Sequence, residues 1–191
     1  MTIARLVRVA TLVSLALAPR AAGASPTAGD VTRVFLVRHA ERLELAGVPD
    51  PPLTLAGSRR AAALGRLLRS ADVATVFATQ FLRCRATAES VSVATGAPVA
   101  VMHSDSSAAL ARTVRGRFRG RTVVIVGHSD SLPHVLAELG WEGREAVEPW
   151  SYDDLGLLEL RGDDPPQFVH LHYGGAADTT GTHGVPAMMK P

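Results

Sequence analysis

An arginine followed by a histidine ends the first apolar run of the chain. Arg38 and His39 come directly after Val31–Val37, whose last four residues are all apolar and which predicts a buried strand. Ligand sites in open α/β sheets lie at the carboxyl ends of the strands. An arginine at such a place needs an anion or a partner, because an unpaired buried charge is costly. Histidine titrates near neutral pH and serves as base, nucleophile or ligand. The pair therefore predicts a reactive site that accepts an anion.

Three further segments place polar side chains beside expected strands or helix starts. Thr79–Glu89 (Thr-Gln-Phe-Leu-Arg-Cys-Arg-Ala-Thr-Ala-Glu) follows one expected strand and opens a helix. Val126–Asp130 (Val-Gly-His-Ser-Asp) ends another strand, and Asp50–Gly57 (Asp-Pro-Pro-Leu-Thr-Leu-Ala-Gly) leads into a helix. Each segment alone is a weak indication, but the four together are highly specific.

These four segments, in this order, resemble the motifs of the histidine phosphatase superfamily, in the branch that includes cofactor-dependent phosphoglycerate mutases and small exported phosphatases. The resemblance covers roughly residues 31–135 and is to the short, single-domain members. It implies a phosphoglycerate mutase-like fold and a phosphohistidine formed on His39. It also implies that Arg38, Arg83 and His128 bind the phosphoryl group.

The residue types themselves suit phosphoryl transfer. That reaction needs a nucleophile in line with the leaving oxygen and positive charge around the other phosphoryl oxygens. The imidazole of His39 can attack phosphorus. Arg38 and Arg83 can form forked hydrogen bonds to phosphoryl oxygens, and His128 adds a further positive or donor group. Arg85 is the alternative to Arg83, but the spacing to the residues that follow favours Arg83.

Three carboxylates are candidates for the general acid that protonates the leaving oxygen, a contribution of about 10²- to 10⁴-fold. Asp105 stands where many family members carry a carboxylate, after the second helix, and is slightly favoured. Asp130 stands where related exported members usually carry Asn, and it could equally cap the helix that follows. Glu41 is the third candidate, with an ion pair to Arg42 or Arg38 as its alternative.

The remaining histidines and the single cysteine give weaker indications. His170 and His172 alternate on an expected strand and so share one face. Two such imidazoles could hold a metal ion, although an ordinary edge-strand face is the more common explanation. The sequence has no Cys/His spacing typical of a metal site, so we expect a reaction without metal or cofactor. Cys84 is the only cysteine, which excludes an internal disulfide, and we expect it to be a buried helix residue.

Strands and helices alternate up to residue 139, which predicts an α/β protein: a three-layer α/β/α sandwich with a mostly parallel central sheet. A Gly-Asp-Asp-Pro-Pro turn at 162–166 predicts that the last two strands pair antiparallel at an edge. The expected strands span residues 31–37, 73–78, 99–102, 122–126, 155–160 and 168–173. The expected helices span residues 55–69, 82–95, 106–118 and 132–139.

The first expected helix, residues 55–69, has one buried face and one exposed face. Thr54 is the expected N-cap. Apolar spacing assigns one buried face, and the arginines are expected elsewhere on the helix. The buried face is expected to carry Ala61, Leu64, Leu67 and Leu68. The arginines of this helix are Arg59, Arg60 and Arg66.

The first 24 residues resemble a secretory signal peptide. Arg5 and Arg8 precede the apolar run Val9–Ala18, which is too short for a stable membrane anchor, and Ala22-Gly23-Ala24 is a typical cleavage pattern. We expect cleavage near Ala24 and export to the periplasm or beyond. We divide the chain into a signal peptide (1–24), a linker (25–30), one domain (31–173) and a flexible tail (174–191).

Removal of the expected signal peptide changes the charge of the chain. The 191 residues contain 20 Lys and Arg against 18 Asp and Glu, and three of the arginines lie in residues 1–24. The remainder carries 17 basic and 18 acidic groups, a net charge of −1 with histidines neutral. A near-neutral chain gives no support for binding nucleic acid. The oligomeric state stays open.

The leading functional hypothesis is an exported, metal-independent phosphomonoester hydrolase. An exported module that binds a phosphorylated ligand with little or no turnover is the alternative. A phosphomutase is less favoured, because about 167 mature residues leave little room for a lid and mutase substrates are cytoplasmic. A short chain implies an open pocket, suited to phosphorylated sugars, envelope glycans or phosphoprotein side chains.

Overall fold

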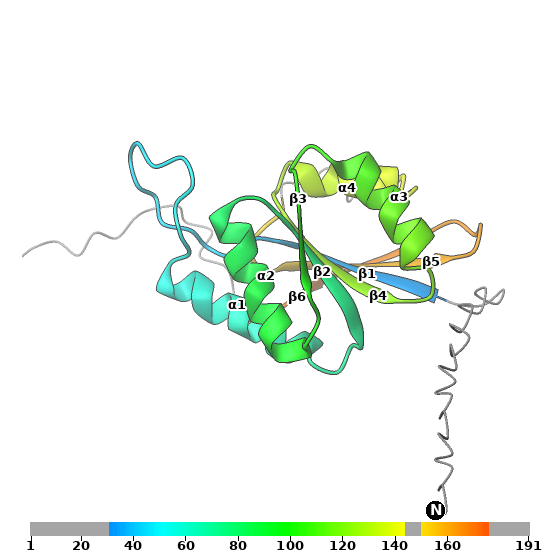
Figure 1. Cartoon of the computed structure of the whole chain (residues 1–191), viewed down its shortest axis with the longest axis horizontal. Coiled ribbons are helices and arrows are strands. Elements are labelled where there is room, and N and C mark those ends of the chain that lie inside the picture. Colours follow the sequence, from blue (N-terminus) through cyan, green and yellow to red (C-terminus); the bar gives the residue numbers. More distant parts are fainter. Residues whose placement is uncertain (1–30, 144–149, 176–191) are drawn as a thin grey trace, which may run out of the picture.

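The computed structural model describes residues 31–143 and 150–175. The predicted signal peptide, the linker and all but the first two residues of the predicted tail lie outside these ranges. The described residues form one mixed sheet with two helices packed on each face (Figure 1). The predicted three-layer α/β/α architecture is confirmed. Within the described ranges, every helix is too short or too polar to cross a bilayer.

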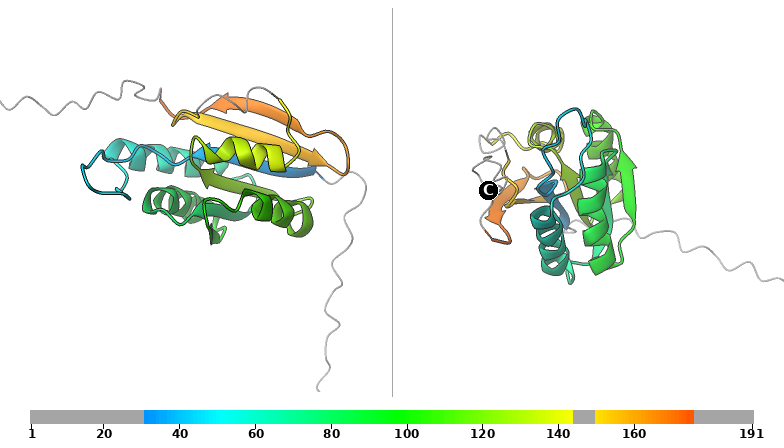
Figure 2. Two further views of the ribbon diagram at one scale, coloured as in Figure 1. Left: turned by 90° about the horizontal axis from the view of Figure 1, so that it is seen from above. Right: turned by 90° about the vertical axis from the view of Figure 1, so that its left-hand side faces the viewer.

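The six strands lie in the order β3-β2-β4-β1-β5-β6. The first four in chain order are parallel to one another, whereas β5 is antiparallel to β1, and β6 is antiparallel to β5. The last two strands therefore extend the sheet at the side opposite β3, as Figure 2 shows. The strands are β1 (Val31–Arg38), β2 (Val73–Thr79), β3 (Val99–Met102), β4 (Thr122–Gly127), β5 (Asp154–Arg161) and β6 (Gln167–His172).

The central strands are apolar along their whole length because helices cover the sheet on both faces. Side chains alternate along β4, so Val123 and Ile125 face one layer while Val124 and Val126 face the other. One layer is α3 (Ser107–Arg117) with α4 (Ser131–Glu138); the other is α1 (Leu55–Leu68) with α2 (Leu82–Thr95). The resulting two cores hold β1 and β4 rigidly in the middle of the sheet.

The predicted elements all occur, with ends that differ by at most one residue. Thr54 caps α1 as expected, since its Oγ1 accepts a hydrogen bond from the backbone N–H of Gly57 at 2.9 Å. The predicted buried face of α1 is wrong at Leu67, which is 55% exposed, whereas Arg60 is only 9% exposed. Both residues lie at the edge of the buried stripe. Arg60 is covered by Glu41 and by the chain after β6, and Leu67, two turns further along, is not.

Candidate active site

The carboxyl ends of β1, β2 and β4 meet at one edge of the sheet, because the three strands are parallel neighbours. Arg38 at the end of β1 pairs in register with Gly127 at the end of β4. The predicted residues that follow these strands therefore lie together, around a cleft of about 590 Å³. The lining of this cleft includes Arg38, His39, Arg83, Asp105, His128 and Asp130.

His39 lies at the base of this cleft and is only 3% exposed. Its Nδ1 is 2.8 Å from the carbonyl oxygen of Ala40. A carbonyl can only accept, so Nδ1 carries the proton and donates, which leaves the ring's lone pair on Nε2. Burial, and then the nearby charges of Arg38, His128 and Arg83, lower the pKa of His39 to about 3, against the opposite effect of the Ala40 hydrogen bond. At neutral pH the ring is therefore neutral, with Nε2 as a potential nucleophile.

Arg83 contacts the lone pair of His39 directly. It lies in the first turn of α2 and donates from Nε to His39 Nε2 over 3.1 Å. Its NH1 donates to Asp50 Oδ1 at 3.1 Å, and Asp50 Oδ2 accepts from the backbone N–H of Leu82 at 2.8 Å. One carboxylate thus fixes both the guanidinium and the start of α2, where Phe81 in the N-cap position offers no side-chain cap.

Asp50 is a member of the site to which the sequence analysis assigned no role. Its only indication was its place in the Asp50–Gly57 segment. Arg85, by contrast, is exposed and does not line the cleft. The structure therefore places Arg83, and not Arg85, beside His39.

Arg38 is held by two residues that follow it by 112 and 114 positions in the sequence. Its NH1 donates to the carbonyl oxygen of Trp150 at 3.0 Å, and its NH2 donates to the hydroxyl of Tyr152 at 3.3 Å. Its guanidinium carbon lies 4.1 Å from the centre of the Tyr152 ring. Its buried Nε has no partner among the described residues. Neither Trp150 nor Tyr152 was singled out from the sequence.

His128 faces His39 across the cleft. Its Nε2 lies 2.9 Å from Thr79 Oγ1, and the centres of the two imidazole rings are 5.3 Å apart in an edge-on arrangement. Burial, followed by the charge of Arg83, lowers the pKa of His128, while Asp130 acts in the opposite direction. The neighbouring thiol of Cys84 is buried, which raises its pKa to about 11 and keeps it protonated. The expectation of a buried helix cysteine is confirmed.

Two of the three candidate acids line the cleft. Asp105 is exposed and pairs with the imidazole of His103. Asp130 occupies the N-cap position of α4, yet its side chain makes no capping hydrogen bond, so its alternative role as a helix cap is wrong. The first residue of α4, Ser131, uses its Oγ to accept a hydrogen bond from the backbone N–H of His128 at 3.0 Å, which ties the start of this helix to the cleft histidine.

Glu41, the third candidate, does not line the cleft. It accepts a hydrogen bond from Arg60 Nε at 2.7 Å, and it lies against the α1 layer. The expected pairing of Glu41 with Arg42 or Arg38 is therefore wrong. Arg42 pairs with Glu44 and itself lines the cleft, as an additional positive charge that the sequence analysis did not select.

Residues 34–105 match the sequence model described as "Histidine phosphatase superfamily (branch 1)". The chain has no match among curated proteins. Three solved structures illustrate the fold it shares, and their identities to this chain are too low to transfer more than the fold.

The first is an Agrobacterium tumefaciens protein given the name phosphohistidine phosphatase SixA, which is 19% identical with a TM-score of 0.58, covering 76% of this chain and 98% of that one. The second is the protein histidine phosphatase SixA complexed with tungstate, at 18% identity and a TM-score of 0.60, covering 73% and 96%. The third is a mycobacterial glucosyl-3-phosphoglycerate phosphatase, at 15% identity and a TM-score of 0.61, covering 76% and 100%.

Proposed function

We propose that this chain, which matches the model of branch 1 of the histidine phosphatase superfamily over residues 34–105, hydrolyses phosphate monoesters outside the cytoplasm through a phosphohistidine formed on His39. The match to the family model and the shared fold both support a phosphatase with a histidine nucleophile. One observation carries the proposal. The Nδ1–H of His39 is held by a carbonyl group, which leaves the lone pair of Nε2 at the base of a cleft surrounded by arginines.

The first half of the reaction forms the covalent intermediate. His39 Nε2 attacks phosphorus, the bond from phosphorus to the ester oxygen breaks, and a carboxylic acid gives its proton to the leaving oxygen. Arg38, Arg83 and His128 donate to the three remaining phosphoryl oxygens. The imidazole gains positive charge as its bond to phosphorus forms. The carbonyl of Ala40, already bonded to Nδ1–H, stabilises that charge without moving.

The second half returns the enzyme to its starting state. A water molecule attacks phosphorus, the phosphorus–nitrogen bond breaks, and the carboxylate removes a proton from the water. Asp105 and Asp130 are the two carboxylates of the cleft able to play this part. The reacting groups in both halves are side chains, so the proposed reaction uses no metal or cofactor.

The substrate we propose is a phosphorylated sugar, an envelope glycan or a phosphoprotein side chain. The names of two fold relatives, a glucosyl-3-phosphoglycerate phosphatase and a protein histidine phosphatase, support these classes. A cleft of about 590 Å³ has room for groups beyond the phosphate itself.

The exposure of both carboxylates favours a second candidate function. Asp105 pairs with His103, and Asp130 is also exposed, so neither is held against His39 in the structure. A cleft that binds a phosphate group without an acid poised for its leaving oxygen would turn over slowly. In that case the chain is a module that binds a phosphorylated ligand.

Rapid-mixing kinetics with a panel of phosphate monoesters tests the leading proposal. We expect a phosphoenzyme that is stable in alkali and labile in acid, and steady turnover of at least one alkyl or sugar phosphate. His39→Ala is expected to abolish both, a loss of at least about 10³-fold. Turnover by His39→Ala near the wild-type rate would refute the nucleophile. A trapped phosphoenzyme without turnover would favour the binding module.

Two inhibitors test the metal-free part of the proposal. We expect vanadate, which mimics five-coordinate phosphorus, to inhibit strongly, since transition-state mimics bind far more tightly than substrates. We expect a chelator to leave the rate unchanged when it is measured well below the melting temperature. Activity that is lost in chelator and restored by zinc would overturn a mechanism that uses side chains alone.

Export is tested by fractionating cells that express the full-length chain. We expect the protein in the periplasm or the medium, with a mature N-terminus close to Ser25. Recovery of a cytoplasmic protein that begins at or near Met1 would contradict the export proposal, while leaving the phosphatase proposal intact.

A further inference from the structure

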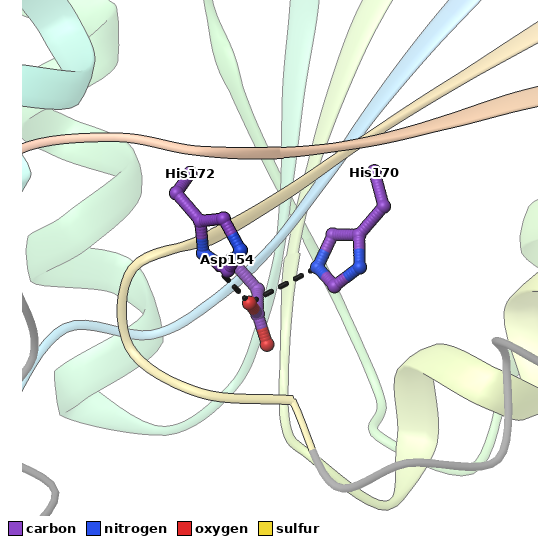
Figure 3. Close-up of side chains that lie close together, drawn as sticks. All are labelled: Asp154, His170 and His172. Carbon is purple, nitrogen blue, oxygen red and sulfur yellow. Dashed lines mark ion pairs between the residues drawn. The ribbon is translucent and has the colours of Figure 1, made fainter.

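Two histidines and an aspartate converge at the edge of the sheet away from β3 (Figure 3). Asp154 is the first residue of β5, and the antiparallel register pairs it with His172 of β6. His170 lies two residues before His172, so both imidazoles project from the same face of β6. The alternation of the two histidines is visible in the sequence, whereas the third ligand comes from a different strand.

We propose that Asp154, His170 and His172 form a binding site for a zinc ion. Asp154 Oδ1 lies 3.0 Å from His170 Nε2 and 3.3 Å from His172 Nδ1. In a tetrahedral zinc site with metal–ligand bonds of 2.0–2.1 Å, neighbouring ligand atoms are about 3.3 Å apart. The two distances from Asp154 Oδ1 are close to this spacing, and all three ligand atoms lie within 4.8 Å of one another, so a small movement of the exposed imidazoles would complete one face of such a tetrahedron.

The donor set selects the class of metal. Imidazole nitrogen suits zinc and its neighbours in the transition series, whereas magnesium and calcium are bound through oxygen. Asp153 adds a second negative charge, with its Oδ2 3.6 Å from His172 Nδ1. Within residues 31–143 and 150–175, no other trio of His, Cys, Asp or Glu converges in this way.

The aspartate is already oriented for binding. Asp154 is only 7% exposed, and its Oδ2 accepts the backbone N–H of Ser151, which directs Oδ1 toward the two rings. A hydrogen bond to the second oxygen of a carboxylate ligand is a usual way of fixing a metal site. The His170 ring also lies 5.9 Å from the ring of Trp150, centre to centre, which limits its rotation.

The proposed zinc has a structural role, distinct from the phosphatase reaction. None of its three ligands lines the cleft. Ser151, which orients Asp154, lies between Trp150 and Tyr152, the two residues that hold Arg38. A bound ion would tie this segment to β6. The inference does not depend on the proposed function, because it concerns a different group of residues and a different measurement.

Zinc titration of the full-length chain, purified without a histidine tag and treated with chelator, tests the proposal. We expect one zinc per chain by calorimetry. At about a hundredfold excess over the dissociation constant, we expect the melting temperature to rise by roughly 5–10 °C. Cobalt is expected to give the intense visible absorption typical of tetrahedral coordination. Weak six-coordinate absorption, or no zinc binding, would overturn the site.

Substitutions identify the ligands. We expect His170→Ala and His172→Ala each to weaken zinc binding at least about tenfold. Val169→Thr changes the residue just before His170, on the opposite face of β6, and His103→Ala removes a histidine that pairs with a single aspartate, so both controls should bind as the wild type does. Hydrolysis of an aryl phosphate reports that each variant is folded. Wild-type affinity in both ligand variants would refute the assignment.

Discussion

Arg83 donates its Nε–H to Nε2 of His39, the nitrogen that we propose attacks phosphorus. This hydrogen bond therefore occupies the lone pair of the nucleophile. A phosphoryl oxygen offers this N–H a charged acceptor in place of a neutral ring nitrogen, and charged acceptors form the stronger bond. We therefore expect a bound phosphate group to accept this N–H in place of His39, which would expose the lone pair of the nucleophile.

Loss of either cleft arginine is expected to slow the reaction severely. We expect Arg38→Ala and Arg83→Ala each to reduce kcat/KM by about 10²-fold or more, the usual cost of removing a donor to a developing oxyanion. Arg85→Ala is the matched control, two residues from Arg83 on the same helix but exposed and outside the cleft. A larger loss in Arg85→Ala than in Arg83→Ala would reverse the assignment.

The general acid is identified by its dependence on the leaving group. An acid assists only the departing oxygen, so its loss matters most for basic leaving groups. We expect Asp105→Asn to slow hydrolysis of an alkyl or sugar phosphate far more than that of an activated aryl phosphate. Asp130→Asn should do so only if Asp130 is the acid. If neither variant separates the two substrate classes, neither Asp105 nor Asp130 is the acid, and the binding module is favoured.

The low pKa of His39 predicts how stability depends on pH. Burial holds this pKa near 3 in the folded protein, against an ordinary value of 6.5, so between these values the unfolded chain binds a proton that the folded protein does not. Stability is therefore lost as the pH falls from about 6.5 toward 3. His39→Gln removes the titrating group. Urea unfolding of both proteins should show the wild type losing more stability between about pH 7 and pH 4.5, and parallel curves would contradict this.

The Glu41–Arg60 pair is expected to stabilise the fold without contributing to turnover. Both side chains are largely buried, and breaking such a pair by removing one partner costs about 3–5 kcal/mol. We expect Glu41→Gln to lower the free energy of unfolding on this scale and to keep the wild-type kcat. Arg33→Ala disrupts an exposed pair with Glu159 and should cost about 1 kcal/mol or less. A stable but inactive Glu41→Gln would restore Glu41 as a candidate acid.

The order of the elements was predictable because it depends on local patterns. Apolar runs typical of buried strands alternate with segments whose apolar residues have helical spacing. Each run ends close to where its strand ends in the structure. Arg38 and His39 are adjacent in sequence, so one strand end places both. Arg83 and His128 follow the ends of two other strands, and parallel neighbours bring their carboxyl ends to one edge.

The partners of these residues depend on packing between distant parts of the chain. Asp50 precedes Arg83 by 33 residues, and Tyr152 follows Arg38 by 114. Arg60 donates both to Glu41 and to the carbonyl oxygen of Tyr173, just after β6, an arrangement that no spacing in the sequence indicates. Asp154 reaches the histidines of β6 through the register of two antiparallel strands. Such contacts are fixed by tertiary structure alone.

The direction of β5 brings the segment that precedes it into contact with Arg38, although β1 itself carries Arg38 and leads to His39. Because β5 runs against β1, the chain enters it at the edge where the parallel strands end, and the residues just before it, Trp150–Asp153, come to lie beside Arg38. Residues leading into a strand can be lengthened or exchanged without shifting its register. Altering this entry segment can therefore change the contacts of Arg38 with Trp150 and Tyr152 without altering the strand that carries His39. For protein engineering, substitutions or insertions that aim to change the contacts of Arg38 belong in the segment that leads into β5.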